Sequence, residues 1–238
     1  MLEVIWRFIP IAICLIASPL AVLAMVGLML GPNAKRNCAA FTLGWLVSIA
    51  AVFAFFLFLL DAIGFTEPHP EALRARILHG IVGVICLTGA FLYYRKAQQV
   101  TAALQAASTP SELAQALPRP RAIKDLEAFS APRSLRVGAL VFLTNPPNLA
   151  LTAATAVEVL SATLTRTEAT GLAIVFMLAA AAPVLAPTMA VLGGWHEKGD
   201  NAHRIFNWTL SHNSFIRAGT MLLIGFIQLG KAVTGGLF

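Results

Sequence analysis

The chain has 238 residues, of which 58% are hydrophobic and only 12% are charged. With a mean hydropathy of +0.78, this composition leaves too little polar surface for a soluble globular protein and excludes that class. The lysine and arginine residues that give the chain its net charge of +6 lie mainly in a few connections between apolar segments. This distribution is typical of membrane topology rather than of nucleic-acid binding.

Six apolar segments are long enough to cross about 30 Å of hydrocarbon at about 1.5 Å per residue. They cover residues 8–30, 40–61, 77–95, 137–158, 170–192 and 214–232. We therefore predict an all-α polytopic membrane protein with six transmembrane helices. The first segment also ends like a cleavable signal peptide. We favour a retained span, because this segment has a counterpart in the second half of the chain.

That counterpart is part of an internal repeat. Ser18-Pro19 in the first segment recurs 127 residues later as Asn145-Pro146 in the fourth segment. The first three and the last three segments therefore look like two copies of one unit. Because each copy has an odd number of spans, successive copies enter the membrane from opposite sides. The pattern predicts two inverted three-helix repeats with proline-broken first and fourth helices, an arrangement typical of transporters.

The repeats divide the chain into three parts. We predict a first three-helix repeat at 1–96, a basic linker at 97–136 and a second repeat at 137–238. Within the linker, Thr109 and Glu112 have the spacing of a capping box, which predicts the start of a short helix. The linker is expected to lie at the membrane surface or to dock a partner.

Lysine and arginine divide unequally between the two sides of the membrane. Twelve lie in or beside the first, third and fifth connections, and five lie on the other side. The positive-inside rule then places the 97–136 linker in the cytoplasm and both termini outside. Trp45, Tyr93 and Tyr94 lie near predicted span ends, as interfacial aromatic side chains do.

The proline breaks are the candidate binding site. A proline removes one backbone donor and clashes with the preceding turn, and in hydrocarbon the freed groups must be satisfied by protein or water. The amides of Asn145 and Asn148 can satisfy the backbone or bind a polar substrate group. We expect Asn148 to point into a central cavity and Asn145 to cap the broken helix. The predicted substrate-binding residues are Ser18, Pro19, Asn145, Pro146, Pro147, Asn148 and Thr152.

A simple kink without a ligand is the alternative interpretation of these breaks. Pro183 and Pro187, which lie in the fifth segment and have no counterpart in the second, are interpreted as kinks or a hinge.

Ionisable residues are missing from the middle of the predicted spans, and Asp61 and Glu158 lie at span ends. Proton relays and cation sites normally use intramembrane carboxylates. The sequence therefore disfavours a metal-ion or proton-driven antiporter and favours a neutral or amphiphilic substrate. The three cysteines have no metal-binding spacing, and no hydrolase, phosphate-loop or metal motif appears. We expect no enzyme activity, metal site or cofactor.

Three stretches of sequence carry a family resemblance. They are Ala17–Leu20, Gly31–Asn37 running into Ala40–Trp45, and Asn145–Leu151. Together they resemble the lysine-exporter (LysE) superfamily and, within it, the GAP/Sap group of glycopeptidolipid- and sulfolipid-addressing proteins. The resemblance covers nearly the whole chain. It implies two inverted three-helix repeats and a role in moving lipids or glycolipids to the cell surface, beside a larger lipid exporter.

These observations predict a transporter or transport accessory that moves a lipid, glycolipid or small amphiphile across the bacterial plasma membrane. A LysE-type exporter of amino acids or small metabolites and a non-transporting scaffold for a larger lipid exporter remain as alternatives. A transporter would line a lumen with Ser18, Asn145 and Asn148, whereas a scaffold would pack them closed. Expected partners are membrane lipids, the amphiphilic substrate, a larger exporter and a second copy of the chain.

Overall fold

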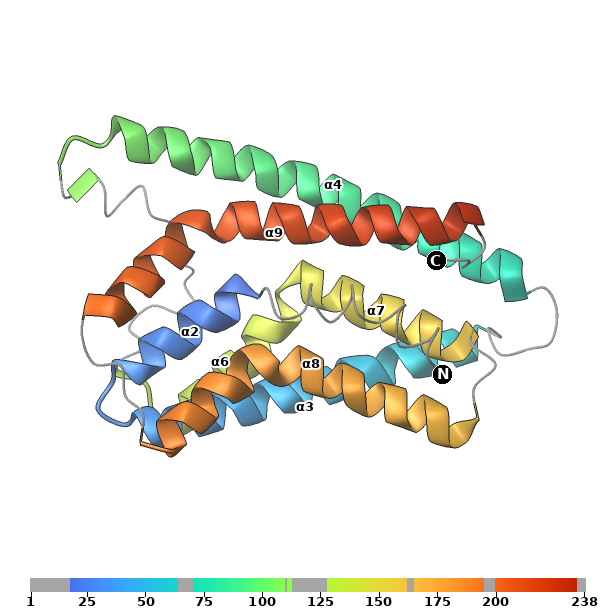
Figure 1. Ribbon diagram of the computed structural model, residues 1–238, viewed down its shortest axis with the longest axis horizontal. Coiled ribbons are helices and arrows are strands. Elements are labelled where there is room, and N and C mark those ends of the chain that lie inside the picture. The colour runs from blue at the N-terminus through green and yellow to red at the C-terminus, as the bar shows by residue number, and fades with distance from the viewer. Residues whose placement is uncertain are drawn as a thin grey trace.

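The computed structural model describes residues 18–63, 71–109, 111–112, 128–161, 165–194 and 200–234. In these ranges the chain is all-helical, as predicted, and contains no strand. The helices are α2 (Pro19–Met29), α3 (Ala34–Ala62), α4 (Glu71–Ala106), α6 (Ala131–Leu143), α7 (Pro146–Ser161), α8 (Arg166–Leu192) and α9 (Asp200–Thr234) (Figure 1).

Four helical segments are long and apolar enough to cross a membrane. They are Ala34–Ala62, Arg76–Ala106, Thr167–Leu192 and Asn207–Thr234. A fifth span is formed if α6 and α7 are counted together, although they are bent by 67° relative to each other. The predicted 8–30 span is described only in its second half, as the short apolar helix α2. The described residues thus contain four or five spans, and a total of six remains a prediction.

Two helices extend well beyond the apolar segments that predicted them. The third segment was expected to end at about 95, but α4 continues to Ala106, and α9 begins at Asp200 rather than at about 214. The apolar run marks only the part inside hydrocarbon. Polar residues such as Gln98 are good helix formers and continue the backbone hydrogen bonding beyond it.

The predicted capping box lies just after α4. Thr109 Oγ1 accepts a hydrogen bond from Glu112 N, and Glu112 Oε2 accepts from the backbone of Thr109 and of Ser108. The hydrogen bonds from these backbone donors lower the pKa of the Glu112 carboxyl, and the bond from Ser108 has the largest effect. The capping box is confirmed, while the rest of the predicted short helix falls outside the described residues.

The helices form two packed groups with α2 and α7 between them. Figure 1 shows α4 and α9 side by side along one edge, and α3, α6 and α8 along the other. Glycine permits the close approach of α4 to α9. A Cβ on Gly225 would lie 2.7 Å from a methyl group of Leu87, and a Cβ on Gly83 would lie 2.8 Å from Leu229. Small residues allow such contact between membrane helices.

The pair α3 and α6 packs even more closely. A Cβ on Gly44 would overlap the carbonyl oxygen of Leu135, and a Cβ on Gly138 would overlap that of Phe41. The two backbones therefore touch without an intervening side chain. Both glycine-lined interfaces, α3–α6 and α4–α9, join a helix from the first half of the chain to a helix from the second half.

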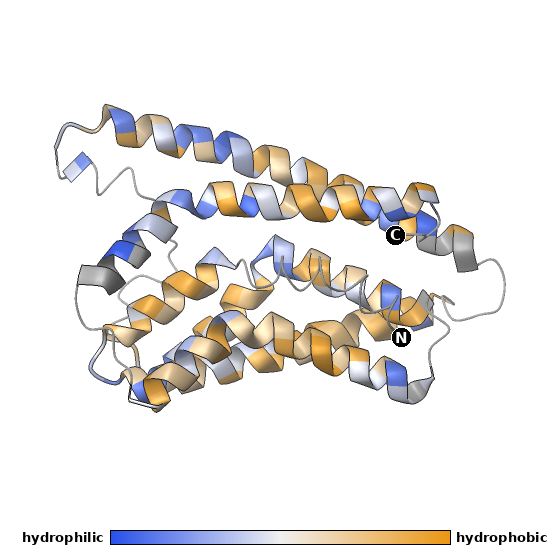
Figure 2. Ribbon diagram, viewed as in Figure 1, coloured by the Kyte–Doolittle hydropathy of each residue, from blue (hydrophilic) through white to orange (hydrophobic). Residues whose placement is uncertain are grey.

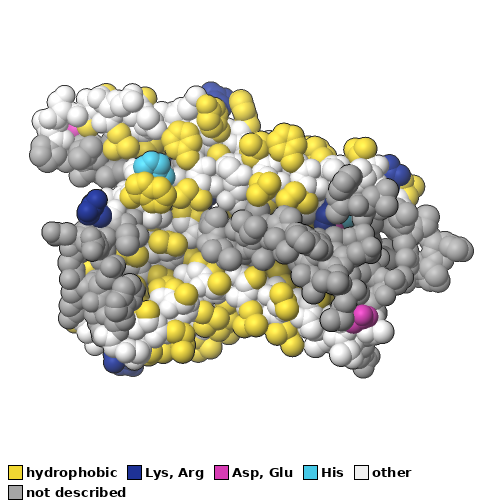
Figure 3. All heavy atoms as spheres, viewed as in Figure 1, with side chains coloured by type: hydrophobic (Ala, Val, Ile, Leu, Met, Phe, Trp, Pro, Cys, Tyr) yellow, Lys and Arg dark blue, Asp and Glu magenta, His cyan; other side chains and the backbone are white. Residues whose placement is uncertain are grey.

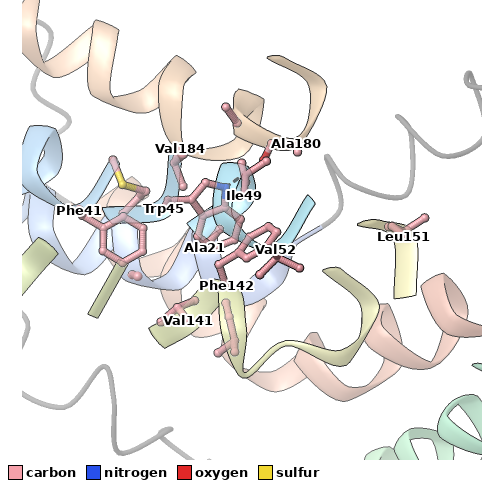
Figure 4. Close-up of a cluster of buried hydrophobic side chains, with 14 of the residues drawn as sticks. Ala21, Phe41, Trp45, Ile49, Val52, Val141, Phe142, Leu151, Ala180 and Val184 are labelled. Atoms are coloured by element: carbon pink, nitrogen blue, oxygen red, sulfur yellow. Dashed lines mark hydrogen bonds between the residues drawn. The ribbon is translucent and has the colours of Figure 1, made fainter. Parts of the chain in front are cut away.

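The core centres on Trp45, whose side chain is 1% exposed. Its ring packs edge-on against Phe142 with centroids 5.1 Å apart, and Ile49 and Val184 lie beside it (Figure 4). The expectation that Trp45 is an interfacial aromatic is wrong. Helix α3 begins at Ala34 rather than at about 40, so Trp45 lies about three turns inside the helix and faces the bundle.

The two prolines of the fifth span lie within a continuous helix, α8. The carbonyl three residues before each proline accepts a side-chain hydrogen bond from α3. Trp45 Nε1 donates to Ala180 O at 3.0 Å, and Thr42 Oγ1 donates to Val184 O at 3.4 Å. A proline frees the carbonyl four residues earlier, which here belongs to Ala179 and to Pro183, so these hydrogen bonds do not replace the lost ones. They join α8 to α3 one residue after each freed carbonyl, and the unbroken helix favours a structural role for both prolines.

Large apolar side chains cover the outside of the bundle. Phe58, Met189 and Phe226 are 73%, 63% and 62% exposed, and hydrophobic residues run along the helices and over the visible surface (Figures 2 and 3). An apolar surface of this extent is suited to lipid rather than to water. The described part of the chain is that of a helical membrane protein.

Candidate functional site

The predicted break in the fourth segment is confirmed, and it lies against the start of α2. The chain bends by 67° between α6 and α7, and α7 begins at Pro146. At the bend, Asn145 Nδ2 donates a hydrogen bond of 3.4 Å to Ser18 Oγ, the residue that precedes Pro19 and α2. The N-termini of α2 and α7 therefore meet at a buried pair of polar side chains.

The two helices begin in the same way. The carbonyl of Ser18 accepts hydrogen bonds from the backbone of Ala21 and Val22, and the carbonyl of Asn145 accepts from Asn148 and Leu149. Proline suits these first helical positions, because their backbone N–H groups would have no partner in the helix. Asn145 thus begins α7 with its backbone carbonyl. The expectation that its side chain caps the helix is wrong, because Oδ1 has no hydrogen-bond partner and Nδ2 contacts Ser18.

Two amide atoms at this junction have no hydrogen-bond partner. Asn148 is 2% exposed, and both its Nδ2 and the Oδ1 of Asn145 are buried and unpaired. A buried polar group without a partner costs about 1–3 kcal/mol. Helix N-termini also carry a partial positive charge. The junction can therefore bind a group that offers an acceptor to Asn148 and a donor to Asn145.

The remaining predicted site residues are buried or tied to the backbone, apart from Pro146. Thr152 Oγ1 donates to Asn148 O at 2.7 Å and is fully buried. Pro19 and Pro147 are also buried, whereas Pro146 is exposed. Ser18, Asn145 and Asn148 are thus packed closed, the arrangement expected of the scaffold alternative, and the unpaired amide atoms are what favour a binding site.

The structure contains a second polar cluster, which the sequence did not predict. Lys231 Nζ lies 2.5 Å from Glu158 Oε1, and His79 Nε2 lies 3.6 Å from the same oxygen. His79 Nδ1 also makes a 2.5 Å hydrogen bond with Gln228 Oε1. All four side chains are buried. This cluster connects α4, α7 and α9 near one end of the bundle.

The cluster was missed because its members lie at the ends of predicted spans, where charged residues usually face water. The signal that could have found it is the isolation of Glu158 and Lys231, each the sole charged residue in a long apolar stretch. Within the part of the chain that the structure describes, no group of three or more His, Cys, Asp or Glu residues could hold a metal ion.

Arg217 is a third polar feature, near the start of the last apolar segment, 214–232. The span of α9 covers Asn207–Thr234, so Arg217 is about 5 Å from its centre along the axis. Its Nη1 donates to the hydroxyl of Tyr93 at 3.3 Å. Its Nε and Nη2 are buried without a hydrogen-bond partner. Tyr93, which was expected to lie at the membrane interface, therefore also links α4 to α9.

The comparison with known families supports the resemblance found in the sequence. A family profile described as "Sap, sulfolipid-1-addressing protein" matches residues 8–234. No curated protein and no solved structure gives a significant match. The match covers all the described helices, whereas membership of the LysE superfamily remains a prediction. The chain belongs to the Sap, sulfolipid-1-addressing protein, family.

Proposed function

We propose that this protein takes part in the export of a lipid, with the polar headgroup of the lipid bound at the junction of α2 and α7. The observation that carries the proposal is the meeting of two helix N-termini at Ser18 and Asn145, beside the unpaired amide of Asn148. Broken helices whose N-termini face each other inside a bundle are a recurrent way to hold a polar substrate group in a membrane.

The chemistry of the junction suits an amphiphile. The amide and the helix N-termini offer hydrogen bonds and partial positive charge to a headgroup. The surrounding helices offer apolar surface to acyl chains, since large hydrophobic side chains cover the outside of the bundle. The name of the family points to a sulfolipid, and a sulfolipid combines such a headgroup with such chains.

The junction is closed in this conformation, so binding requires a rearrangement. The Ser18–Asn145 hydrogen bond of 3.4 Å is a weak link between α2 and α7 and is the contact that a headgroup would replace. We place the two helices in inverted repeats of the LysE type, which predicts that the site opens alternately to the two sides of the membrane.

The scaffold alternative keeps one specific observation in its favour, the burial of all three polar side chains. Under that alternative the protein assembles a larger lipid exporter and binds no lipid at the junction. Substitution of Asn148 distinguishes the two functions, because its Nδ2 makes no hydrogen bond in the closed structure.

The test is the lipid composition of the cell surface in a deletion strain complemented with Asn148→Ala. We expect reduced export of the lipid with normal amounts of folded protein. Asn33→Ala is the matched control, because Asn33 is exposed and makes no side-chain cap. Normal export by Asn148→Ala would overturn the proposed site, and an unchanged lipid profile in the deletion strain itself would overturn the export function.

A further inference from the structure

Arg217 is a cation in the bundle with one edge of its guanidinium unused. The unpaired atoms are Nε and Nη2, which lie on the same side of the planar group. The remaining nitrogen, Nη1, is held by the hydroxyl of Tyr93, and the guanidinium carbon lies 5.4 Å from the centre of the Tyr93 ring. Tyr93 therefore orients the guanidinium and leaves its bidentate edge without a hydrogen-bond acceptor.

The charge of Arg217 has no acidic partner among the described residues. The two ion pairs found there both involve Glu158, which is bound by Lys231 and His79. Arg217 as a whole is partly buried, but its Nε and Nη2 are buried. Burying charged donors without a counter-charge or an acceptor is costly. Such an arrangement is expected where a ligand supplies the missing charge.

We propose that the Nε and Nη2 edge of Arg217 binds the oxyanion of a lipid headgroup, a sulfate or a phosphate. The parallel N–H groups of an arginine edge match two oxygens of such an anion, a fit that lysine cannot reproduce. This inference rests on the proposed function, because the role in lipid export is the reason for assigning the anion to a lipid headgroup and not to a free ion.

The position of Arg217 suits this role. It lies within the stretch of α9 that is long and apolar enough to cross a membrane, and a charge inside such a stretch usually marks a functional site. Asn213 is one turn earlier on the same helix face, and its buried Oδ1 is also unpaired. That oxygen accepts a hydrogen bond, so the pair suits a headgroup that carries both an anion and a hydroxyl group, as a sulfated sugar does.

The experiment measures binding of sulfatide, a sulfated galactosylceramide, to the purified full chain in detergent by native mass spectrometry. The uncharged galactosylceramide is the matched ligand, and sodium sulfate tests the free anion. We expect sulfatide to bind at least about tenfold more tightly than galactosylceramide, as a charge-assisted bidentate contact requires. Equal binding of the two lipids would overturn the proposal, and competition by sodium sulfate at equimolar concentration would show a free-anion site instead of a lipid site.

Variants of Arg217 locate the binding. Arg217→Gln should abolish the preference for sulfatide, and Arg217→Lys should keep only part of it. Arg95→Gln is the control, because Arg95 is an exposed arginine on α4 and should leave the preference intact. A preserved preference in Arg217→Gln, or its loss in Arg95→Gln, would contradict the assignment.

A stability measurement separates a ligand site from a structural arginine. Without lipid, Arg217→Gln should unfold at the same temperature as the parent protein or higher, because it removes an uncompensated buried charge. A clear fall in the unfolding temperature together with unchanged lipid preference would make Arg217 structural. Loss of sulfatide preference in Arg217→Gln, together with an unchanged lipid profile in the deletion strain, would keep this site and overturn the export function. Reduced export in Asn148→Ala, together with no sulfatide preference in the parent protein, would keep the export function and overturn this site.

Discussion

Lys231 and Glu158 form a buried ion pair across α9 and α7, with Nζ 2.5 Å from Oε1, although 73 residues separate them in the chain. Arg217 lies on the same helix as Lys231, 14 positions earlier, without a comparable partner among the described residues. Helix α9 thus carries one neutralised and one uncompensated cation into the bundle. The first is expected to hold helices together and the second to receive a ligand.

Breaking the ion pair should destabilise the protein. Lys231→Met leaves the Glu158 carboxylate buried without its cation, which costs about 3–5 kcal/mol when one partner of a buried pair is removed. The unfolding temperature in detergent is the measurement. The double variant Lys231→Met/Glu158→Gln should recover most of the loss, and Lys35→Met, at an exposed position, should have little effect. A double variant as unstable as the single one would contradict the pairing.

Adding a methyl group between α3 and α6 should be disruptive. In Gly44→Ala the new Cβ overlaps the backbone of Leu135, and backbone atoms cannot rotate aside, so we expect a loss of about 3 kcal/mol or more. Gly171→Ala is the control, because nothing lies within 4 Å of its added Cβ and alanine favours the helix by up to about 1 kcal/mol. The amounts of folded protein after purification and the unfolding temperatures test this. Equal stability of the two variants would refute the close packing.

The two asparagines of the junction should differ in their effect on stability. Asn145→Ala removes the hydrogen bond to Ser18 and should cost about 1 kcal/mol, whereas Asn148→Ala removes an unpaired buried donor and should be neutral or slightly stabilising. A double-mutant cycle with Ser18→Ala measures the Ser18–Asn145 coupling directly. If Asn148→Ala is the more destabilising of the two, its amide is structural.

The predicted orientation can be tested by cysteine labelling of intact cells. Gln105→Cys lies in the predicted cytoplasmic linker and should react with an impermeant thiol reagent only after permeabilisation. Ile63 is exposed and follows the C-terminal end of α3, on the side of the membrane predicted to be outside. Ile63→Cys should therefore react in intact cells. Native Cys38 and Cys86 are buried and should add little background, and the substitution Cys14→Ser removes the third native cysteine. The reverse labelling pattern would place both termini in the cytoplasm.

The features predictable from the sequence are those that depend on neighbouring residues. The bend at Asn145–Pro146 follows from a proline that cannot continue a helix, and the capping box at Thr109 follows from side chains three residues apart. The offset of 127 residues between Ser18-Pro19 and Asn145-Pro146 also corresponds to a real contact, since Ser18 and Asn145 touch.

The features that were missed depend on which helices become neighbours. Glu158 and Lys231 look like independent interfacial charges until α7 and α9 are packed together. Arg217 was counted with the connection before the last apolar segment, because polar residues precede it and hide the start of the helix at Asp200. Trp45 looked interfacial for the same reason. Pairings between distant segments are set by packing complementarity, which a single sequence does not display.

The glycine contact between α3 and α6 has a consequence for how the protein is made. Gly138 follows Gly44 by 94 positions, which at about 5–20 residues per second is a delay of about 5–20 s during synthesis. Throughout that interval the small-residue face of α3 is in the bilayer without its partner, and α4 likewise waits for α9. Insertion of the first helices and their final packing are therefore separate events in time. The helices of the first half of the chain therefore reach their final packing only after the second half has been inserted.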